Sequence, residues 1–180
     1  MNLLDNAVAA MFLSFIFGML VNSVLSRMTF YERLGERYLF SDAKTYEKLG
    51  VLGFRKILLI TPLGWFNREI RISEERSPAK LRTIRMHMVN SEVAHWAGFA
   101  AMLALMFVAW RYRGPKIAAA YLICNVLGNL YPCLLQQYNK RRIMRVIEIA
   151  GSRKARNASS DDRERRTASS HAGPDPGNRN

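Results

Sequence analysis

The chain has 180 residues, and its 27 Lys and Arg against 14 acidic residues give a formal net charge of +13. Its mean hydropathy is near zero, yet the apolar residues fall into three blocks separated by cation-rich segments, as in small multi-pass membrane proteins. Because the cations flank these blocks and form no folded basic surface, the composition excludes a nucleic-acid binder. It indicates membrane lipid with anionic headgroups as the partner.

The first apolar block, residues 7–25, predicts a membrane span. At about 1.5 Å per residue it reaches about 28 Å, close to the hydrocarbon thickness of a bilayer. A cleaved signal peptide has cations before its apolar run and a small-residue cleavage site after it. Here Asp5 precedes the run and Ser26-Arg27 follows it, so we expect the segment to be retained.

Residues 28–66 are predicted to lie on the membrane surface. In their first part apolar side chains recur at helical spacing, and Asp42 and Gly50 are suited to cap a short helix. Residues 51–66 are apolar as well, but two cations beginning at Arg55 lie inside them and a Thr-Pro-Leu-Gly sequence interrupts them. We therefore predict an interfacial or re-entrant segment there and not a span.

A long helix is predicted to begin at Ser77 and Pro78. A Ser side chain can accept a hydrogen bond from a backbone N–H of the first turn, and Pro at the first helical position loses no intrahelical bond. The chain then continues without a helix breaker as far as Gly98. We expect this helix to run outside the bilayer first and to cross it over residues 93–110.

A turn at Gly114-Pro115 is expected to lead into the third span, residues 116–135, with Pro132 as a kink near its far end. Residues 1–150 then form the membrane domain. In residues 151–180 the only apolar content is Ala, so nothing offsets the entropy of ordering them and we predict a disordered basic tail.

The predicted fold class is therefore all-α: an integral membrane protein with about three transmembrane helices, an interfacial or re-entrant segment and a disordered C-terminal tail. Only three cations, Arg111, Arg113 and Lys116, lie around the turn between the second and third spans, and the others lie on the opposite side of those spans. Because cytoplasmic loops carry the excess of Lys and Arg, we expect the basic loops and the tail to be cytoplasmic.

Glu92 is the only acidic residue in or beside the second and third spans. A carboxylate costs about 2.5 to 3.5 kcal/mol at the bilayer centre on insertion scales, so a functional reason is expected for it. His95 follows three positions later on the same helix face, where a carboxylate can orient one ring nitrogen and leave the other as a proton acceptor. We predict His95 as a catalytic base and Glu92 as its orienting partner.

Folding the chain near Arg113 places His95 level with Tyr131 and Glu92 level with Leu134. Polar residues form a stripe on the third span at this level, so two polar helix faces are expected to meet near the cytoplasmic boundary. The stripe consists of Asn125, Asn129, Pro132 and Gln136, with Asn139 and Arg142 just beyond it.

The same residues also have a purely structural interpretation. Asn, Gln and a Glu-His pair can hold two helices together, because interhelical hydrogen bonds contribute about 0.6 to 2 kcal/mol in membranes. The alternative function is therefore a non-catalytic multi-pass protein that binds anionic lipid or serves as a partner subunit. A Glu-x-x-His pair also occurs in di-iron bundles, but those need a second pair and further carboxylates, so no metal is expected.

Two segments carry a resemblance to a known family. Residues 92–96 read Glu-Val-Ala-His-Trp, similar to a Glu-x-x-His-Trp motif, and residues 129–132 match Asn-x-x-Pro. Residues 136–142 are similar to Gln-Arg-Tyr-Asn-Arg-Pro-Arg, with Gln137 and Arg141 as departures. These motifs resemble the bacterial glycosyl-4,4′-diaponeurosporenoate acyltransferases, which complete staphyloxanthin-type carotenoids by acylating the sugar.

The resemblance extends more weakly over residues 30–150 and implies an enzyme of the bacterial cell membrane. Its implied reaction is the esterification of a hydroxyl of a glycosylated carotenoid or similar glycolipid with a fatty acyl group, without a cofactor and with acyl-CoA as co-substrate. Cytoplasmic cations are expected to attract the phosphates of that donor. The implied functional region comprises Glu92, His95, Asn129, Pro132, Gln136, Tyr138, Asn139 and Arg142.

A division of roles within this region is our mechanistic prediction. His95 takes the proton from the acceptor hydroxyl, and Asn129 or Gln136 donates to the oxyanion that forms when an acyl thioester is attacked. Tyr138, Asn139 and Arg142 are predicted to bind substrate together with these two amides.

Overall fold

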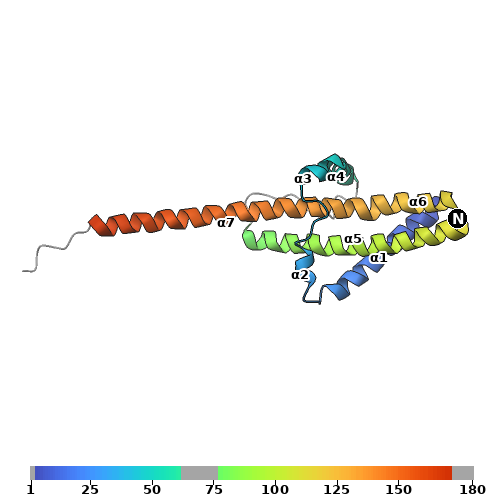
Figure 1. Cartoon of the computed structure of the whole chain (residues 1–180), viewed down its shortest axis with the longest axis horizontal. Helices are drawn as coiled ribbons and strands as arrows, with labels where there is room; N and C mark the ends of the chain where they lie inside the picture. Colours follow the sequence, from blue (N-terminus) through green and yellow to red (C-terminus); the bar gives the residue numbers. More distant parts are fainter. Residues whose placement is uncertain (1–2, 62–76, 172–180) are drawn as a thin grey trace, which may run out of the picture. The chain divides into compact units, whose positions relative to one another are not determined.

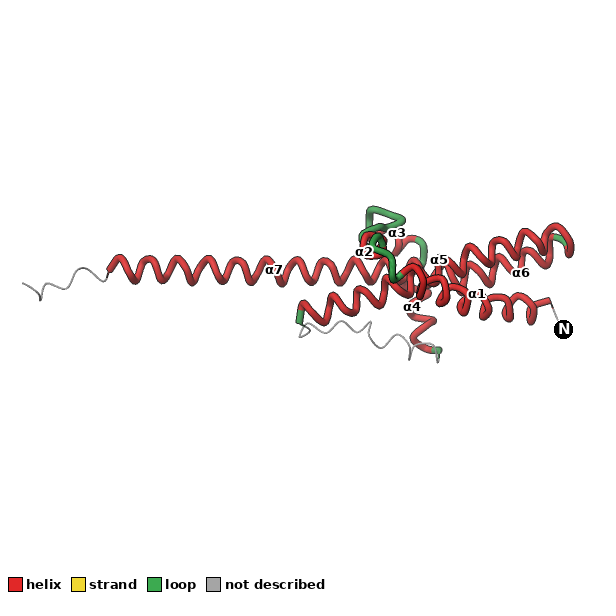
Figure 2. The backbone as a smooth tube through the Cα atoms, turned by 90° about the horizontal axis from the view of Figure 1, so that it is seen from below, coloured by secondary structure: helices red, strands yellow, loops and turns green. Residues whose placement is uncertain are grey.

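The computed structural model describes residues 3–61 and 77–171, and every regular element within them is helical (Figure 2). Three helical stretches are long and apolar enough to cross a membrane: Asn6–Leu25, Ala79–Arg113 and Pro115–Ser160. The prediction of an all-α membrane protein with three spans is therefore confirmed. The elements, of which Figure 1 labels the α-helices, are α1 (Leu3–Leu25), α2 (Tyr31–Leu34), α3 (Ala43–Lys48), α4 (Val51–Ile60), α5 (Pro78–Arg113), α6 (Pro115–Asn125), the π-helical turn η2 (Val126–Leu130) and α7 (Tyr131–His171).

The helix boundaries follow the local sequence signals. The side chain of Asp42 accepts a hydrogen bond from the backbone N–H of Lys44 and begins α3, as predicted. Gly50 adopts a left-handed φ of +77° between α3 and α4, a conformation that glycine adopts at little cost. The side chain of Ser77 accepts a hydrogen bond from the backbone N–H of Lys80, and α5 begins at the next residue, so the predicted start of the long helix is confirmed.

The spans α1, α5 and α6 pack against one another (Figure 1). Two glycines permit close approach of α1 to α5. A Cβ atom added to Gly98 would lie 2.9 Å from the backbone oxygen of Ser14, and one added to Gly18 would overlap the backbone oxygen of Ala94. Small residues at such crossings allow the backbones of membrane helices to approach closely. The opposite face of α1 carries exposed apolar side chains, as expected for contact with lipid: Leu13, Ile16, Phe17 and Leu20.

The third span is interrupted by the π-helical turn η2, which ends two residues before Pro132. Proline lacks a backbone N–H, and its ring would meet the carbonyl of the residue four positions earlier, which is Gly128. A wider turn removes this clash, and single π-helical turns of this kind are frequent at functional sites. The sequence predicts a kink near Pro132, and the structure contains a local change of helical type there.

The segment after α2 packs against the first part of α7. Tyr46 of α3 and Val51 of α4 are fully buried, and they form one apolar cluster with Leu134, Leu135 and Tyr138 (Figure 1). The helix α4 ends at Ile60, and with 10 residues it is too short to cross a bilayer. The remainder of the predicted interfacial or re-entrant segment lies outside the described residues.

The chain divides into two compact units, Met1–Ile143 and Met144–Asn180. In the second unit the helix α7 continues to His171, and the disorder predicted from residue 151 onward stays a prediction. Residues 152–171 contain neither Gly nor Pro and include five Arg and three Ala, which are strong helix formers. Local backbone preference is therefore compatible with a helix, although this stretch has no large apolar side chain to bury. Residues 172–180 lie outside the described residues.

The close approach of α1 and α5 predicts opposite effects for two glycine substitutions. Gly98→Ala places a methyl group 2.8 Å from Asn129 Oδ1 and 2.9 Å from the Ser14 backbone oxygen, and overpacking of this kind costs about 1–3 kcal/mol. Gly53→Ala has no atom within 4 Å of its new methyl group, so the helix should gain about 0.5–1 kcal/mol. Melting temperatures in detergent should fall for the first variant and rise for the second, and an unchanged value for Gly98→Ala would contradict the packing.

Candidate active site

A buried ion pair joins α5 to α7. The Nζ of Lys140 lies 2.7 Å from Oε2 of Glu92, and both side chains are removed from solvent. Lys140 also donates to the backbone oxygen of Arg37 at 3.1 Å, and Gln137 Nε2 donates to the second carboxylate oxygen of Glu92 at 2.7 Å. Both carboxylate oxygens are thus bonded, which compensates for the desolvation of the charged groups.

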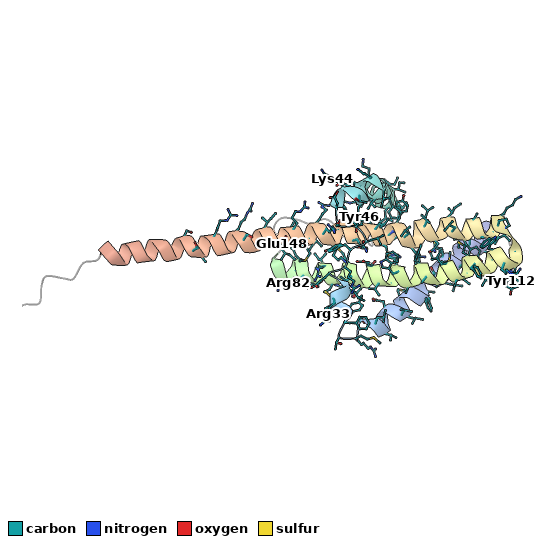
Figure 3. All side chains as sticks on the ribbon, viewed as in Figure 1. Arg33, Lys44, Tyr46, Arg82, Tyr112 and Glu148 are labelled. Atoms are coloured by element: carbon teal, nitrogen blue, oxygen red, sulfur yellow. The ribbon has the colours of Figure 1, made fainter. Side chains whose placement is uncertain are left out.

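Gln137 extends this network to the segment that precedes α3. Its Oε1 accepts hydrogen bonds from the backbone N–H of Leu39 at 3.0 Å and from the hydroxyl of Tyr46 at 2.7 Å. Burial raises the pKa of Tyr46, so the phenol keeps the proton that it donates. Figure 3 labels Tyr46, which lies on the side of α3 that meets α7.

Arg141 holds the same segment from a second position. It donates to the backbone oxygens of Phe40 and Ser41, each at 2.6 Å. The ring of Tyr38 lies 4.3 Å from the guanidinium carbon of Arg141 and 4.6 Å from Nζ of Lys140, within the range of a cation–π interaction. The segment 37–46 is therefore fixed on α7 by charged and polar contacts.

His95 lies on α5 outside this network. Its Nδ1 is buried and makes no hydrogen bond, and its ring meets the ring of Phe15 edge-on at 5.5 Å. Asn129 is near enough to interact with the imidazole electrostatically, and its own Oδ1 is likewise buried without a partner. The carboxylate of Glu92 binds Lys140 and Gln137 instead of His95, so the predicted hydrogen bond between Glu92 and His95 is not formed.

Two cavities meet at His95. The larger has a volume of about 630 Å³, within the roughly 300–1,000 Å³ of small-molecule sites. Its walls are mostly apolar and come from α1, α4, α5, α6, η2 and α7. The smaller, of about 360 Å³, lies between α1 and α5 and is more polar. Phe15, Ser91 and His95 line both cavities, so the imidazole is accessible from either side.

The five predicted substrate-binding residues lie in different environments. Gln136 lines the larger cavity and donates to the hydroxyl of Ser91 at 3.3 Å. Asn129 is buried beside His95, and its Nδ2 donates to Ser14 Oγ and Asn125 Oδ1. The other three lie further along α7: Tyr138 is buried and donates to Glu47, Asn139 is buried with both amide atoms unpaired, and Arg142 is exposed.

The structure therefore brings His95, Asn129 and Gln136 together around the larger cavity, and it separates Glu92 from them by pairing it with Lys140. In the sequence Lys140 is only one of the cations that follow the third span. One feature of the sequence could have indicated this pairing. A buried carboxylate at Glu92 requires a cation, and Lys140 lies less than two helical turns beyond Leu134, the residue predicted to lie level with Glu92. Among residues 3–61 and 77–171, no group of three or more His, Cys, Asp or Glu side chains could hold a metal ion.

The sequence of this region matches a known family over most of the chain. A model of the glycosyl-4,4′-diaponeurosporenoate acyltransferases matches residues 27–149, which is more than half of the 180 residues. The chain belongs to this family. No curated protein and no solved structure matches it. As a member of the glycosyl-4,4′-diaponeurosporenoate acyltransferase family the protein is an enzyme that transfers acyl groups, and the matched range contains both His95 and the Glu92–Lys140 pair.

Removing the buried cation should destabilise the protein strongly. Lys140→Met leaves the Glu92 carboxylate buried without its partner, and breaking a buried pair from one side costs about 3–5 kcal/mol. Arg142→Met removes an exposed cation from the same helix and should have little effect. The double variant Glu92→Gln with Lys140→Met should recover part of the loss, because no unpaired charge remains. Thermal unfolding in detergent measures all three, and equal melting temperatures for Lys140→Met and Arg142→Met would refute a stabilising pair.

Proposed function

We propose that the protein esterifies a hydroxyl group of a glycosylated carotenoid, or of a similar glycolipid, with a fatty acyl group at the membrane. The observation that carries this proposal is the position of His95, whose Nδ1 is buried without a hydrogen-bond partner and whose ring lines an apolar cavity of about 630 Å³. The proposal adds the acceptor and the donor to the acyl transfer that the family performs.

The larger cavity suits the acyl chain. Its lining residues on the third span run from Cys124 to Gln136, a distance of about 18 Å at about 1.5 Å per residue. Apolar side chains such as Phe12, Ile57 and Leu127 form most of its wall, so a hydrocarbon chain can replace lipid contacts there without loss of hydrogen bonds. The chain would end with its carboxyl carbon near His95.

In the proposed reaction His95 acts as a general base. An imidazole nitrogen takes the proton of the acceptor hydroxyl as its oxygen attacks the carbonyl carbon of an acyl thioester, and a new C–O bond forms. The tetrahedral intermediate then expels the thiolate as the C–S bond breaks, and the imidazolium returns the proton to the sulfur. Acyl-CoA supplies the thioester in this scheme, and neither the proton count nor the electron count requires a cofactor.

Gln136 and Ser91 are the donors best placed to stabilise the oxyanion. Both line the larger cavity, and the 3.3 Å contact between them is long enough to be exchanged for a stronger bond to a charged oxygen. Asn129 is less suited, because its Nδ2 already donates to Ser14 and Asn125. Of the two amides predicted from sequence, the geometry therefore favours Gln136.

A cation of α4, Arg55, lies beside the larger cavity, whose lining itself contains no Lys or Arg among the described residues. Arg55 follows the lining residue Phe54, and its Nε is buried without a hydrogen-bond partner. Arg55 and Arg142 both lie within electrostatic range of the Tyr138 hydroxyl. A phosphate of the acyl donor would find two guanidinium groups here, which supports acyl-CoA as the donor and a cytoplasmic position for this end of the molecule.

His95→Ala should fold normally and lose about 10²- to 10⁴-fold in turnover, because general-base catalysis contributes that much to rate. The matched control is His87→Ala, which removes an exposed imidazole that lines the same cavity. The measurement is ester formation by purified protein with palmitoyl-CoA and a glucoside acceptor, together with a melting curve. Full turnover in His95→Ala, or an equal loss in both variants, would rule out the base.

Filling the larger cavity should change the preferred length of the acyl chain. Leu127→Trp adds bulk at a residue that lines the cavity, whereas Leu122→Trp adds it at an exposed position on α6 that is absent from the lining. We expect the first variant to prefer acyl-CoA donors several carbons shorter than the wild type does, because the cavity volume limits the chain. The second should keep the wild-type profile. A competition assay with mixed acyl-CoA donors and mass spectrometry of the ester products gives both profiles.

A further inference from the structure

The smaller cavity has a lining that differs in chemistry from that of the larger one. Four of its residues are polar, Asn22 from α1 and Asn90, Ser91 and His95 from α5. Its lining contains no Lys, Arg, Asp or Glu among the described residues. A cavity with amide, hydroxyl and imidazole groups but no charge suits a neutral ligand that has several hydroxyl groups.

One buried tyrosine fixes the two amides of this cavity. The Tyr31 hydroxyl lies 2.5 Å from Asn22 Oδ1 and 2.7 Å from Asn90 Oδ1. Burial raises the pKa of Tyr31, so the phenol keeps its single proton and donates it to one of the two amide oxygens at a time. Because both amide oxygens face Tyr31, both Nδ2 groups are oriented elsewhere, and within the described part of the chain neither makes a hydrogen bond. Two pre-positioned amide donors are thus left for a ligand.

We infer that this smaller cavity binds the sugar of the acceptor, with Asn22 and Asn90 donating hydrogen bonds to its hydroxyl groups. The inference rests on the proposed function and adds to it the place where the acceptor is recognised. Ser91 and His95 line both cavities, so a sugar hydroxyl in the smaller cavity and a thioester carbon at the end of the larger one meet at the same imidazole.

The absence of cations from this lining separates it from the predicted donor site. A phosphate-bearing group would be bound poorly by two neutral amides, since phosphate sites use Arg, Lys or several backbone N–H groups. A simple fatty alcohol would leave both amides unpaired, and polar groups left unpaired against a bound ligand reduce affinity. The cavity therefore selects a neutral glycosyl group over an alcohol without a sugar.

The test compares two acceptor probes of equal chain length, dodecyl β-glucoside and dodecanol. The full-length protein in lipid nanodiscs receives palmitoyl-CoA, and kcat/KM is measured for each acceptor. We expect the wild type to prefer the glucoside by about tenfold or more, which corresponds to the loss of one or two neutral hydrogen bonds. Asn22→Ala and Asn90→Ala should each reduce this preference several-fold and leave the KM for palmitoyl-CoA unchanged.

Two further variants separate recognition from folding. Ser23→Ala alters an exposed neighbour of Asn22, and Thr83→Ala alters an exposed residue of α5, so both should retain the preference. Ala94→Val adds bulk to the lining of the smaller cavity without removing a polar group, and it should lower kcat/KM for the glucoside more than for dodecanol. A melting curve for each variant identifies any that fail to fold.

The outcomes distinguish this inference from the proposed function. If the wild type prefers the glucoside but both Asn variants and Ala94→Val keep that preference, the inference is wrong and the proposed function stands. If the wild type esterifies neither acceptor, the proposed function fails. Binding of dodecyl β-glucoside, measured as a rise in melting temperature, then decides the role of the cavity. If the glucoside stabilises the wild type but not Asn90→Ala, the sugar site is retained. If it stabilises the wild type and Asn90→Ala equally, the sugar site is wrong.

Discussion

The arrangement of this molecule depends on one buried carboxylate, Glu92, and the cation that neutralises it. Charged groups of this kind are costly inside a membrane protein unless they are paired and fully hydrogen-bonded. On α7, Lys140 supplies the opposite charge and Gln137 the second hydrogen bond to the Glu92 carboxylate. These contacts give α5 and α7 a single favourable register. Lys140 and Gln137 also bind the segment before α3 through Arg37 and Leu39. The same contacts therefore position α3 and α4, and α4 supplies part of the wall of the larger cavity.

Because Glu92 pairs with Lys140, α5 has two distinct faces, one that holds the helices together and one that lines the cavities. Ser91 and His95 are four residues apart and share one face, as i and i+4 positions do in a helix, and that face lines both cavities. Glu92 lies one position further around the helix, where α7 covers it and Cys133 Sγ donates to its backbone oxygen. The charge that fixes the helices is thus kept apart from the imidazole that is available for chemistry. A base that carries no permanent partner remains free to exchange a proton with substrate.

Sequence reasoning reached the backbone arrangement more accurately than the side-chain pairing. Hydropathy predicts the three spans, and local capping signals predict the helix starts at Asp42 and Ser77. Helix rise predicts that Glu92 lies level with Leu134, and the observed contact of Glu92 is with Cys133, one residue away. The partner of Glu92 depends on how far α5 and α7 rotate about their axes, which no local pattern specifies. Spacing alone favoured His95, three residues away, because the competing cation lies 48 residues away in sequence. Beyond residue 151 composition indicates only that no core can form, and it does not specify the backbone of α7, which continues to His171.

The helix α1 has a particular place in this site, because the family match begins only at residue 27. The matched range supplies His95, Ser91 and Gln136, whereas α1 supplies Phe15 to both cavities and Asn22 to the smaller one. The fit of α1 against α5 is set by Gly18 and Gly98, where backbone atoms approach too closely for any larger residue. A small shift of α1 would therefore change the width of both cavities and leave the catalytic groups in place. In the proposed scheme the groups that carry acyl transfer lie within the matched range, and the acceptor site is shared between Asn90 inside that range and Asn22 of α1 outside it.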